Sequence, residues 1–459
     1  MERIRMSVKK ENQEEKKENI SRREFIGRTA VGTAGIMIVP RHVLGGEGYV
    51  APSDKLNIAC VGAGGQGAHD VEGVSSENIV ALCDVDEERA AETFEKYPKA
   101  KKYTDFRIML EKENKNIDAV TVTTPDHTHA VIAMMAIKMG KHVYVQKPLT
   151  HTIYEARKLA EAARKAKVVT QMGNQGHAGE GARLVNEWIW DGAIGNVYEA
   201  HCWTNRPIWP QNIPRPDTLP SLPPTLDWNL WLGPAPWRPY HPAYAPFAWR
   251  GWWDFGTGAI GDMGAHVMDQ PFWALKLDAP ETVQATSTPF NEETFPMASM
   301  VTFTFPARGN MVPVKLVWYD GGFLPPRPDD FEDGRMMGEW GGGVLFMGDK
   351  GRLMCSVYGE SPRIIPESKM REYKLPEKTI PRSPGIHEEW IAACKGGPPA
   401  NSNFDYASKL TETMLLGNLA IRMASKNTIL RWDPVNLKVT NLDEANEFIQ
   451  LKYRKGWEL

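Results

Sequence analysis

The chain has 459 residues, more than one ordinary hydrophobic core holds, so we expect two domains. Apolar residues make up 42% and charged residues 24%, which is the composition of a soluble globular protein. A formal net charge of −3 argues against a general affinity for nucleic acid, and no apolar run approaches the roughly 20 residues that span a bilayer.

Residues 1–52 are expected to be an export signal and a linker. The segment Ser21-Arg22-Arg23-Glu24-Phe25-Ile26 resembles the twin-arginine (Tat) signal S-R-R-x-F-L, and the apolar stretch after it ends at Pro40. That stretch is too short for a membrane helix. We predict export to the periplasm by the Tat translocase, which moves folded proteins; a chance arginine pair is the alternative.

Strands and helices alternate from Leu56 onward. Strands are predicted at 56–62, 79–83, 117–123 and 142–145, and helices at 86–97, 130–139 and 153–166. This alternation is typical of a parallel, doubly wound α/β sheet. We predict an N-terminal Rossmann domain over residues 53–175.

A glycine-rich turn follows the first strand. It has the G-x-G-x-x-G pattern, in which the glycines allow a tight turn and a close approach to a pyrophosphate at a helix N-terminus. Asp84 ends the next strand, where a carboxylate accepts hydrogen bonds from ribose hydroxyls and repels a 2′-phosphate. We predict NAD rather than NADP, bound by Gly62, Gly64, Gly65, Gln66, Gly67 and Asp84.

Two further strand ends carry chemical side chains. Residues 123–129 (TTPDHTH) are expected to form a loop beside the nicotinamide ribose, with Thr123, Pro125 and His129 at the cofactor. No acidic or histidine partner stands at metal-ligand spacing from this H-x-H, so we predict no metal. Lys147 follows the fourth strand, where an ammonium can contact the cofactor and stabilise a developing alkoxide; a solvent-exposed lysine is the alternative.

The remainder, residues 176–459, is predicted to be an α/β domain with an open, largely antiparallel sheet. Strands are expected at 282–288, 297–305, 311–319 and 343–346, a hairpin turn at 348–351, and a covering helix at 406–424. A Trp- and Pro-rich insertion at 203–255 holds 8 of the 16 Trp. A segment of this length and composition indicates either a functional wall or a self-packed lid.

Asp262 and His266 are four residues apart in GDMGAH. If the segment is helical they share one face, so that the carboxylate can orient the imidazole or both can face substrate. Histidine is the side chain best suited to accept a proton near neutral pH. An ordinary surface ion pair would have the same spacing.

The order of these motifs resembles the Gfo/Idh/MocA family, and the resemblance covers residues 56 to about 425. It implies an NAD(P) domain followed by a sheet domain that binds substrate and forms a homo-oligomer, a dimer or tetramer. It also implies catalytic roles for Lys147, Asp262 and His266. Gln146 stands where the family has Glu, which puts the protonation of Lys147 in question. Pro271 is expected to kink the helix after His266.

The substrate is expected to be a carbohydrate, because sugars stack their C–H faces on tryptophan and need polar partners for their hydroxyls. Candidate substrate-binding residues are Asn174, His177, Arg206, Arg250, Trp252, Trp253 and Tyr319. We predict an NAD-dependent oxidoreductase acting on a sugar CH–OH group, for example a glycoside 3-dehydrogenase, with tightly bound cofactor. A hydrolase or lyase that uses NAD transiently, and an inactive sugar-binding protein, are the alternatives.

Overall fold

The computed structural model describes residues 54–459, so the Tat-like segment lies outside the described residues. The first sheet has six parallel strands in the order β3-β2-β1-β4-β5-β6. The strands are β1 (Asn57–Val61), β2 (Asn78–Cys83), β3 (Lys101–Tyr103), β4 (Ala119–Val122), β5 (His142–Gln146) and β6 (Thr170–Gly173). The predicted Rossmann sheet is confirmed, but its strands β3 and β6 were not predicted from the sequence.

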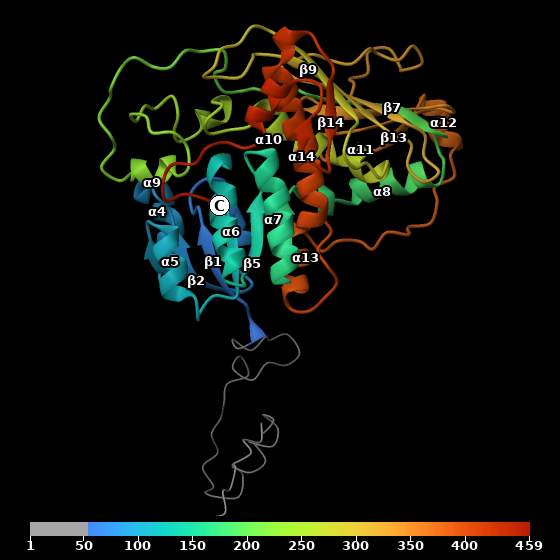
Figure 1. Cartoon of the computed structure of the whole chain (residues 1–459). Coiled ribbons are helices and arrows are strands. Elements are labelled where there is room, and N and C mark those ends of the chain that lie inside the picture. Colours follow the sequence, from blue (N-terminus) through green and yellow to red (C-terminus); the bar gives the residue numbers. More distant parts are fainter. Residues whose placement is uncertain (1–53) are drawn as a thin grey trace, which may run out of the picture. The chain divides into compact units, whose positions relative to one another are not determined.

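Helices cover both faces of this sheet (Figure 1). Against one face pack α5 (Phe106–Glu113), α6 (Asp126–Lys138) and α7 (Ile153–Ala166). Against the other pack α3 (Gln66–Gly73), α4 (Glu87–Lys96) and α13 (Ile386–Cys394). The helix starts follow from local chemistry: Asp86 and Asp105 cap α4 and α5, and Thr152 and Glu155 form a capping box on α7.

The second sheet has nine strands in the order β13-β12-β11-β7-β10-β9-β8-β14-β15. Only the β7–β10 pair is parallel, so the expected open, largely antiparallel sheet is confirmed. The strands are β7 (Val197–Thr204), β8 (Thr282–Ser287), β9 (Ser299–Phe305), β10 (Val314–Tyr319), β11 (Gly342–Gly348), β12 (Arg352–Cys355), β13 (Arg363–Ile365), β14 (Leu430–Asp433) and β15 (Lys438–Val439).

The long helix α14 (Phe404–Arg422) packs against α7 of the first domain and against α10 and β8 of the second. The other helices are α8 (Glu180–Trp190), α9 (Trp228–Leu232), α10 (Gly258–Val267), α11 (Asp269–Ala274) and α12 (Glu367–Glu372), with 3₁₀ turns η2 (Gln175–Ala178), η3 (Ala248–Gly251), η4 (Ala424–Lys426) and η5 (Asp443–Phe448). None of the helices in the described part of the chain is long and apolar enough to cross a bilayer.

Pro271 interrupts the helix that carries Asp262 and His266, as its position in the sequence predicts. Helix α10 ends at Val267 and α11 starts at Asp269, so Pro271 lies in the first turn of α11, where its missing N–H is not needed. The Val267 carbonyl, four residues before the proline, accepts a hydrogen bond from the Cys202 thiol at 3.3 Å instead. The break fixes where the helix bearing the chemical residues ends.

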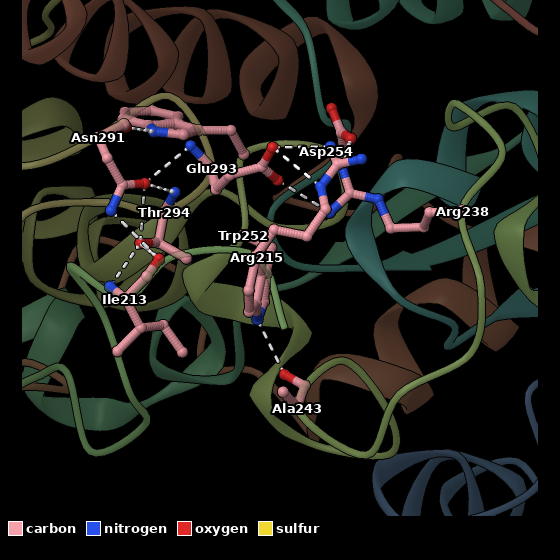
Figure 2. A network of polar contacts seen from close by, with 10 residues as sticks. Ile213, Arg215, Arg238, Ala243, Trp252, Asp254, Asn291, Glu293 and Thr294 are labelled. Carbon is pink, nitrogen blue, oxygen red and sulfur yellow. Dashed lines mark hydrogen bonds and ion pairs between the residues drawn. The ribbon is translucent and has the colours of Figure 1, made fainter. Parts of the chain in front are cut away.

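The aromatic insertion has a small core of its own, made by Leu226, Trp228, Trp231, Leu232, Ala235, Tyr244, Ala245, Trp249, Trp252 and Phe255. A polar network beside this core joins four stretches of the chain, around residues 215, 238, 254 and 293 (Figure 2). The buried Arg238 guanidinium pairs with both Asp254 and Glu293, and Arg215 pairs with Glu293 at 2.7 Å. The insertion is therefore packed and anchored.

Candidate active site

A cavity of about 630 Å³ runs along the carboxyl ends of the parallel strands, between the Rossmann sheet and the second domain. Lys147, after β5, and Phe106, after β3, both line it. Because β3 is an edge strand and β5 lies on the other side of β1, the cavity follows most of the sheet edge. This is where open α/β sheets bind dinucleotides.

The glycine-rich turn fits a dinucleotide. A Cβ on Gly62 would lie 2.2 Å from the Thr123 carbonyl oxygen, and one on Gly67 would lie 2.2 Å from the Gly62 carbonyl oxygen. Gly62 also has a φ of +84°, which favours glycine. The helix α3 begins at Gln66, and the Gly67 and Ala68 N–H groups at its start donate to the Gly64 and Gly65 carbonyls of the turn at 3.0 and 3.1 Å. Gly62, Gly64 and Gln66 line the cavity directly, whereas Gly65 and Gly67 shape the turn.

Asp84, directly after β2, lines the cavity. Its carboxylate accepts hydrogen bonds from the Ala63 N–H at 2.8 Å, the Gly64 N–H at 3.1 Å and the Asp86 N–H at 3.0 Å. Burial raises the pKa of Asp84, and these three hydrogen bonds oppose the shift. The carboxylate thus ties the end of β2 to the glycine-rich turn, at the place where a ribose would lie.

Lys147 and Asp262 form the charged centre of the site. The Lys147 ammonium contacts the Asp262 carboxylate at 2.9 Å. Arg250 and Arg206 approach the same carboxylate at 3.5 and 4.0 Å. Burial alone would raise the pKa of Asp262, but the charges of Lys147 and Arg250 outweigh burial and lower it to about 2. Asp262 is therefore ionised, and it holds Lys147 in place.

His266 faces the cavity from the next turn of α10, which is helical as the spacing required. Its imidazole is buried, packs edge-on against the Tyr358 ring with centroids 4.8 Å apart, and has no hydrogen-bond partner on Nδ1 within the described residues. Burial and the nearby Lys147 charge lower the pKa of His266 to about 3. The side chain is neutral at physiological pH and free to accept a proton. No hydrogen bond between Asp262 and His266 is present, so the carboxylate orients Lys147 rather than the imidazole.

Asp126 is a second buried carboxyl in the cavity wall. It accepts a hydrogen bond from the Thr257 hydroxyl at 2.6 Å. Burial raises the pKa of Asp126 to about 7, against the opposing effects of Thr257, Arg250 and Lys147. The site therefore holds two proton-transfer groups with widely separated pKa values, one carboxyl and one imidazole.

Residues 126–129 are corrected from loop to helix, because α6 begins at Asp126. Thr123 and Pro125 line the cavity as expected, but His129 does not. Its two ring nitrogens lie 2.8 Å from the Pro148 carbonyl and 2.7 Å from the Thr124 carbonyl. His129 therefore connects the ends of β4 and β5 from behind, and we withdraw it from the cofactor-contact set. No group of metal-ligating side chains occurs among residues 54–459.

Arg250 lines the cavity as predicted; Arg206 is not a lining residue, although its guanidinium lies 4.0 Å from the carboxylate of Asp262, which is one. Five other substrate-binding candidates do not line it, and we remove them from the proposed wall: Asn174, His177, Trp252, Trp253 and Tyr319. His177 is buried against Asp269, with Nδ1 3.0 Å from the carboxylate. Tyr319 contacts His201 within the second sheet. These five residues lie in segments near the cavity, but their side chains are packed inside the protein and do not reach it.

Several lining residues escaped the sequence analysis. Arg89 lies across the glycine-rich turn, since a Cβ on Gly65 would be 2.5 Å from its Nη2. Its position five residues after Asp84, in the first turn of the following helix, was an available signal. Tyr358 and Trp457 come from hairpin and tail segments that carry no motif.

Comparison with known proteins agrees with this geometry. Residues 56–174 match the Gfo/Idh/MocA oxidoreductase family model for the NAD-binding Rossmann fold. Residues 210–312 match that family's model for the C-terminal alpha/beta domain. The chain belongs to the Gfo/Idh/MocA family. Its first domain is therefore an NAD-binding domain.

The chain spans less than half the length of the curated relatives that it matches here. An inositol 2-dehydrogenase of Salmonella paratyphi B is 30% identical over 130 residues, 28% of this chain and 38% of the relative. A levoglucosan dehydrogenase of Pseudarthrobacter phenanthrenivorans is 25% identical over 189 residues, 41% of this chain and 40% of the relative. A glycosyl hydrolase family 109 protein of a Shewanella species is 27% identical over 206 residues, 39% and 44% respectively.

Solved structures share the fold. The WlbA dehydrogenase of Bordetella pertussis, in complex with NADH and UDP-GlcNAcA, superposes with a TM-score of 0.57 at 15% identity, over 83% of this chain and 99% of that one. A levoglucosan dehydrogenase in complex with NADH and levoglucosan gives 0.55 at 18% identity, over 82% and 99%. At these identities the likeness concerns the fold alone.

Gln146, the departure from the Gfo/Idh/MocA pattern, has a structural explanation. Its amide donates hydrogen bonds to both oxygens of the buried Asp70 at 3.0 and 2.9 Å. Asp70, on α3, also accepts from the Thr123 hydroxyl at 2.7 Å and pairs with His387 of α13 at 3.1 Å. Gln146 therefore contacts the carboxylate of Asp70 on α3. The carboxylate that contacts Lys147 is a different one, that of Asp262.

Proposed function

We propose that the protein is an NAD-dependent oxidoreductase that oxidises a secondary hydroxyl of a sugar or glycoside. The observation that carries the proposal is the arrangement of Lys147, Asp262 and His266 in one wall of the cavity. The ammonium can polarise the substrate oxygen, and the neutral imidazole can accept the hydroxyl proton. When bound, NAD supplies the acceptor for the hydride that leaves the carbinol carbon. Asp262 keeps the ammonium oriented throughout.

The substrate class follows from the remaining wall. Phe247, Trp249 and Tyr358 give flat apolar surfaces, and the Arg250 guanidinium lies 4.2 Å from the Trp249 ring. Ring faces and a fixed cation suit a polyhydroxylated ring, which has C–H faces and hydroxyls. Family relatives named as inositol and levoglucosan dehydrogenases are consistent with this class.

We further propose that the cofactor remains bound through repeated turnovers. The Tat-like segment at Ser21–Ile26 predicts a periplasmic enzyme, where free NAD is scarce. Each hydride removed must then be returned, either to a second sugar or to the same substrate. We also propose that the protein is a homo-oligomer.

A second reaction is favoured by one observation, the buried Asp126 carboxyl in the same cavity. Oxidation to a ketone acidifies the neighbouring C–H, so a second base could remove that proton and expel a leaving group. Water then adds, and return of the hydride restores the alcohol. The net reaction is hydrolysis of a glycoside, in keeping with the relative named as a glycosyl hydrolase. An inactive sugar-binding protein is disfavoured, because Lys147, Asp262 and His266 are all in place.

The deciding experiment incubates the purified, untreated protein with a panel of glycosides and no added NAD, and identifies products by mass. Repeated turnover with a second sugar as oxidant supports redox exchange. Two results together support the hydrolytic cycle. The aglycone is released, and the sugar product carries one deuterium from D₂O on the carbon next to the one that is oxidised. One product per bound NAD would reject the closed cycle, and no product with any sugar would reject the proposed function.

A further inference from the structure

The tail of the chain, residues 449–459, follows η5 and returns to the Rossmann domain, where it contacts α7 and α5 (Figure 1). It is held at three points. The Ile449 carbonyl accepts from the Tyr154 N–H at 3.1 Å, and the Tyr453 hydroxyl donates to Glu155 at 3.0 Å. Trp457, only 7% exposed, then lines the cavity. The tail is therefore docked along its length.

Trp457 packs against the first turn of α5. Its ring lies 6.1 Å from the Phe106 ring and 4.4 Å from the Arg107 guanidinium. Phe106 follows β3, on the side of β1 opposite Lys147. In a Rossmann sheet the acidic residue that ends β2 holds the adenosine ribose. The Phe106–Trp457 wall thus lies at the adenosine end of the cavity.

The aromatic insertion roofs the same end. Leu226, Leu230 and Trp231 line the cavity there. The insertion is joined to the end of β2 by hydrogen bonds from the Asp227 N–H to the Val85 carbonyl at 2.8 Å and from the Glu87 N–H to the Thr225 carbonyl at 3.0 Å. The roof is therefore hydrogen-bonded directly to the strand end that would hold the ribose.

The tail braces this roof. The Arg454 guanidinium donates to the Gly233 carbonyl at 2.7 Å and to the Asn229 carbonyl at 2.8 Å, and the Arg454 N–H donates to the Pro234 carbonyl at 3.1 Å. Displacing the roof would break these bonds, and displacing the tail would expose Trp457. Each segment thus opposes opening of the other.

We propose that residues 449–459 close the adenosine end of the cofactor cleft, with Trp457 as a wall for the adenine, and that this closure sets how long NAD stays bound. The inference rests on the proposed function only in taking NAD as the retained cofactor. It assigns to the tail a binding role toward the dinucleotide. The catalytic residues at the other end of the cavity are not involved, so the chemistry at saturating NAD should not depend on the tail.

The test measures the release of bound radiolabelled NAD into excess unlabelled NAD, on the full chain. Trp457→Ala should release NAD about ten- to a hundredfold faster, the loss expected when one stacked aromatic is removed from a base. Arg454→Met, which removes the side-chain hydrogen bonds between the tail and the roof without changing a lining residue of the cavity, should also speed release. Trp457→Phe and the matched surface variant Trp340→Ala should behave as the native protein.

Release at the native rate from both Trp457→Ala and Arg454→Met would overturn the inference. Thermal melting with saturating NAD checks that each variant is folded, and Arg454→Met carries the test if Trp457→Ala does not fold. A native protein that binds no NAD would instead reject the proposed function. The two failures are therefore distinguishable.

Discussion

The Lys147 ammonium lies 2.9 Å from Oδ1 of Asp262 and 2.8 Å from the carbonyl oxygen of the same residue. Two contacts to one residue fix both the position and the direction of the lysine. Lys147→Ala should lower kcat by about a hundredfold or more while NAD still binds, because the ammonium acts on charge that develops in the transition state. Cofactor titration beside steady-state kinetics checks this. Near-native turnover would remove Lys147 from the mechanism.

Asp262→Asn should have a smaller effect, about tenfold on kcat, because the carbonyl contact to Lys147 remains while the charge that orients the ammonium is lost. The informative comparison is with Lys147→Ala combined with Asp262→Asn. If Asp262 acts only through Lys147, the double variant should be no slower than Lys147→Ala. A further large loss would show that Asp262 contacts the substrate itself.

His266 should act as a base, and the pH profile of kcat/KM should show no fall in activity near the ordinary pKa of histidine. With a pKa lowered to about 3, the imidazole is unprotonated from about pH 5 upward, so its availability does not change between pH 5 and 8. His266→Ala should lower kcat by about a hundredfold. In an Asp126→Asn background, which removes the other titrating group, kcat/KM should be flat over this range. A limb near pH 6.5 would mean that the imidazole is not buried as described.

Asp126 should make stability depend on pH. Its pKa is raised from 3.8 to about 7, so the native state binds the proton more tightly than the unfolded state. That contribution is present below about pH 4 and is lost as the pH rises through 7, to a limit of about 4 kcal/mol. The Tm of Asp126→Asn relative to the native protein should therefore increase from pH 4 to pH 8. The buried Glu155 titrates in both proteins and cancels in the difference; a constant difference would contradict the assignment.

Asp84 should determine the choice of cofactor. A carboxylate beside the ribose opposes a 2′-phosphate by several kcal/mol. Asp84→Ser should narrow the preference for NAD over NADP by about tenfold or more, and Arg89 across the turn offers a cation to the added phosphate. Fluorescence titration of native and variant protein with both cofactors measures the change. Equal affinity of the native protein for NAD and NADP would refute the role.

The export signal is tested apart from the fold. Replacing Arg22 and Arg23 with Lys should keep the protein in the cytoplasm, because the arginine pair is recognised by the translocase receptor. Cell fractionation followed by immunoblotting measures the distribution. Unchanged export would show that the segment is not a Tat signal.

Periodic and motif-bearing elements were predictable from the sequence. Helix α7 was predicted at its observed bounds, because a capping box and an amphipathic run mark both of its ends. Strands β3 and β15 were not predicted, because strands of three and two residues are too short to show an alternation of apolar and polar residues. The central strand β7 was missed because its residues from Ala200 to Thr204 are all buried and show no alternation of buried and exposed positions.

The chemical residues were predictable where a motif fixes them on a strand end or a helix face, as for Lys147, Asp262 and His266. The residues of the substrate wall were not predictable. Composition shows that the insertion contains tryptophans, but it does not show in which direction each side chain points. Trp252 is fully buried in the insertion, whereas Trp249, three residues earlier, reaches the cavity. That difference depends on the packing of the whole insertion.

The contact between Gln146 and Asp70 limits how this site can change by single substitutions. Gln146→Glu would restore the family's usual residue, but it would place a second carboxylate within hydrogen-bonding distance of a buried one, so one of the two would have to take up a proton. Asp70→Asn alone would leave the Gln146 amide facing a group that is no longer charged. The two positions are therefore expected to change together, and a descendant of this chain that carries Glu at 146 should carry a neutral side chain at 70.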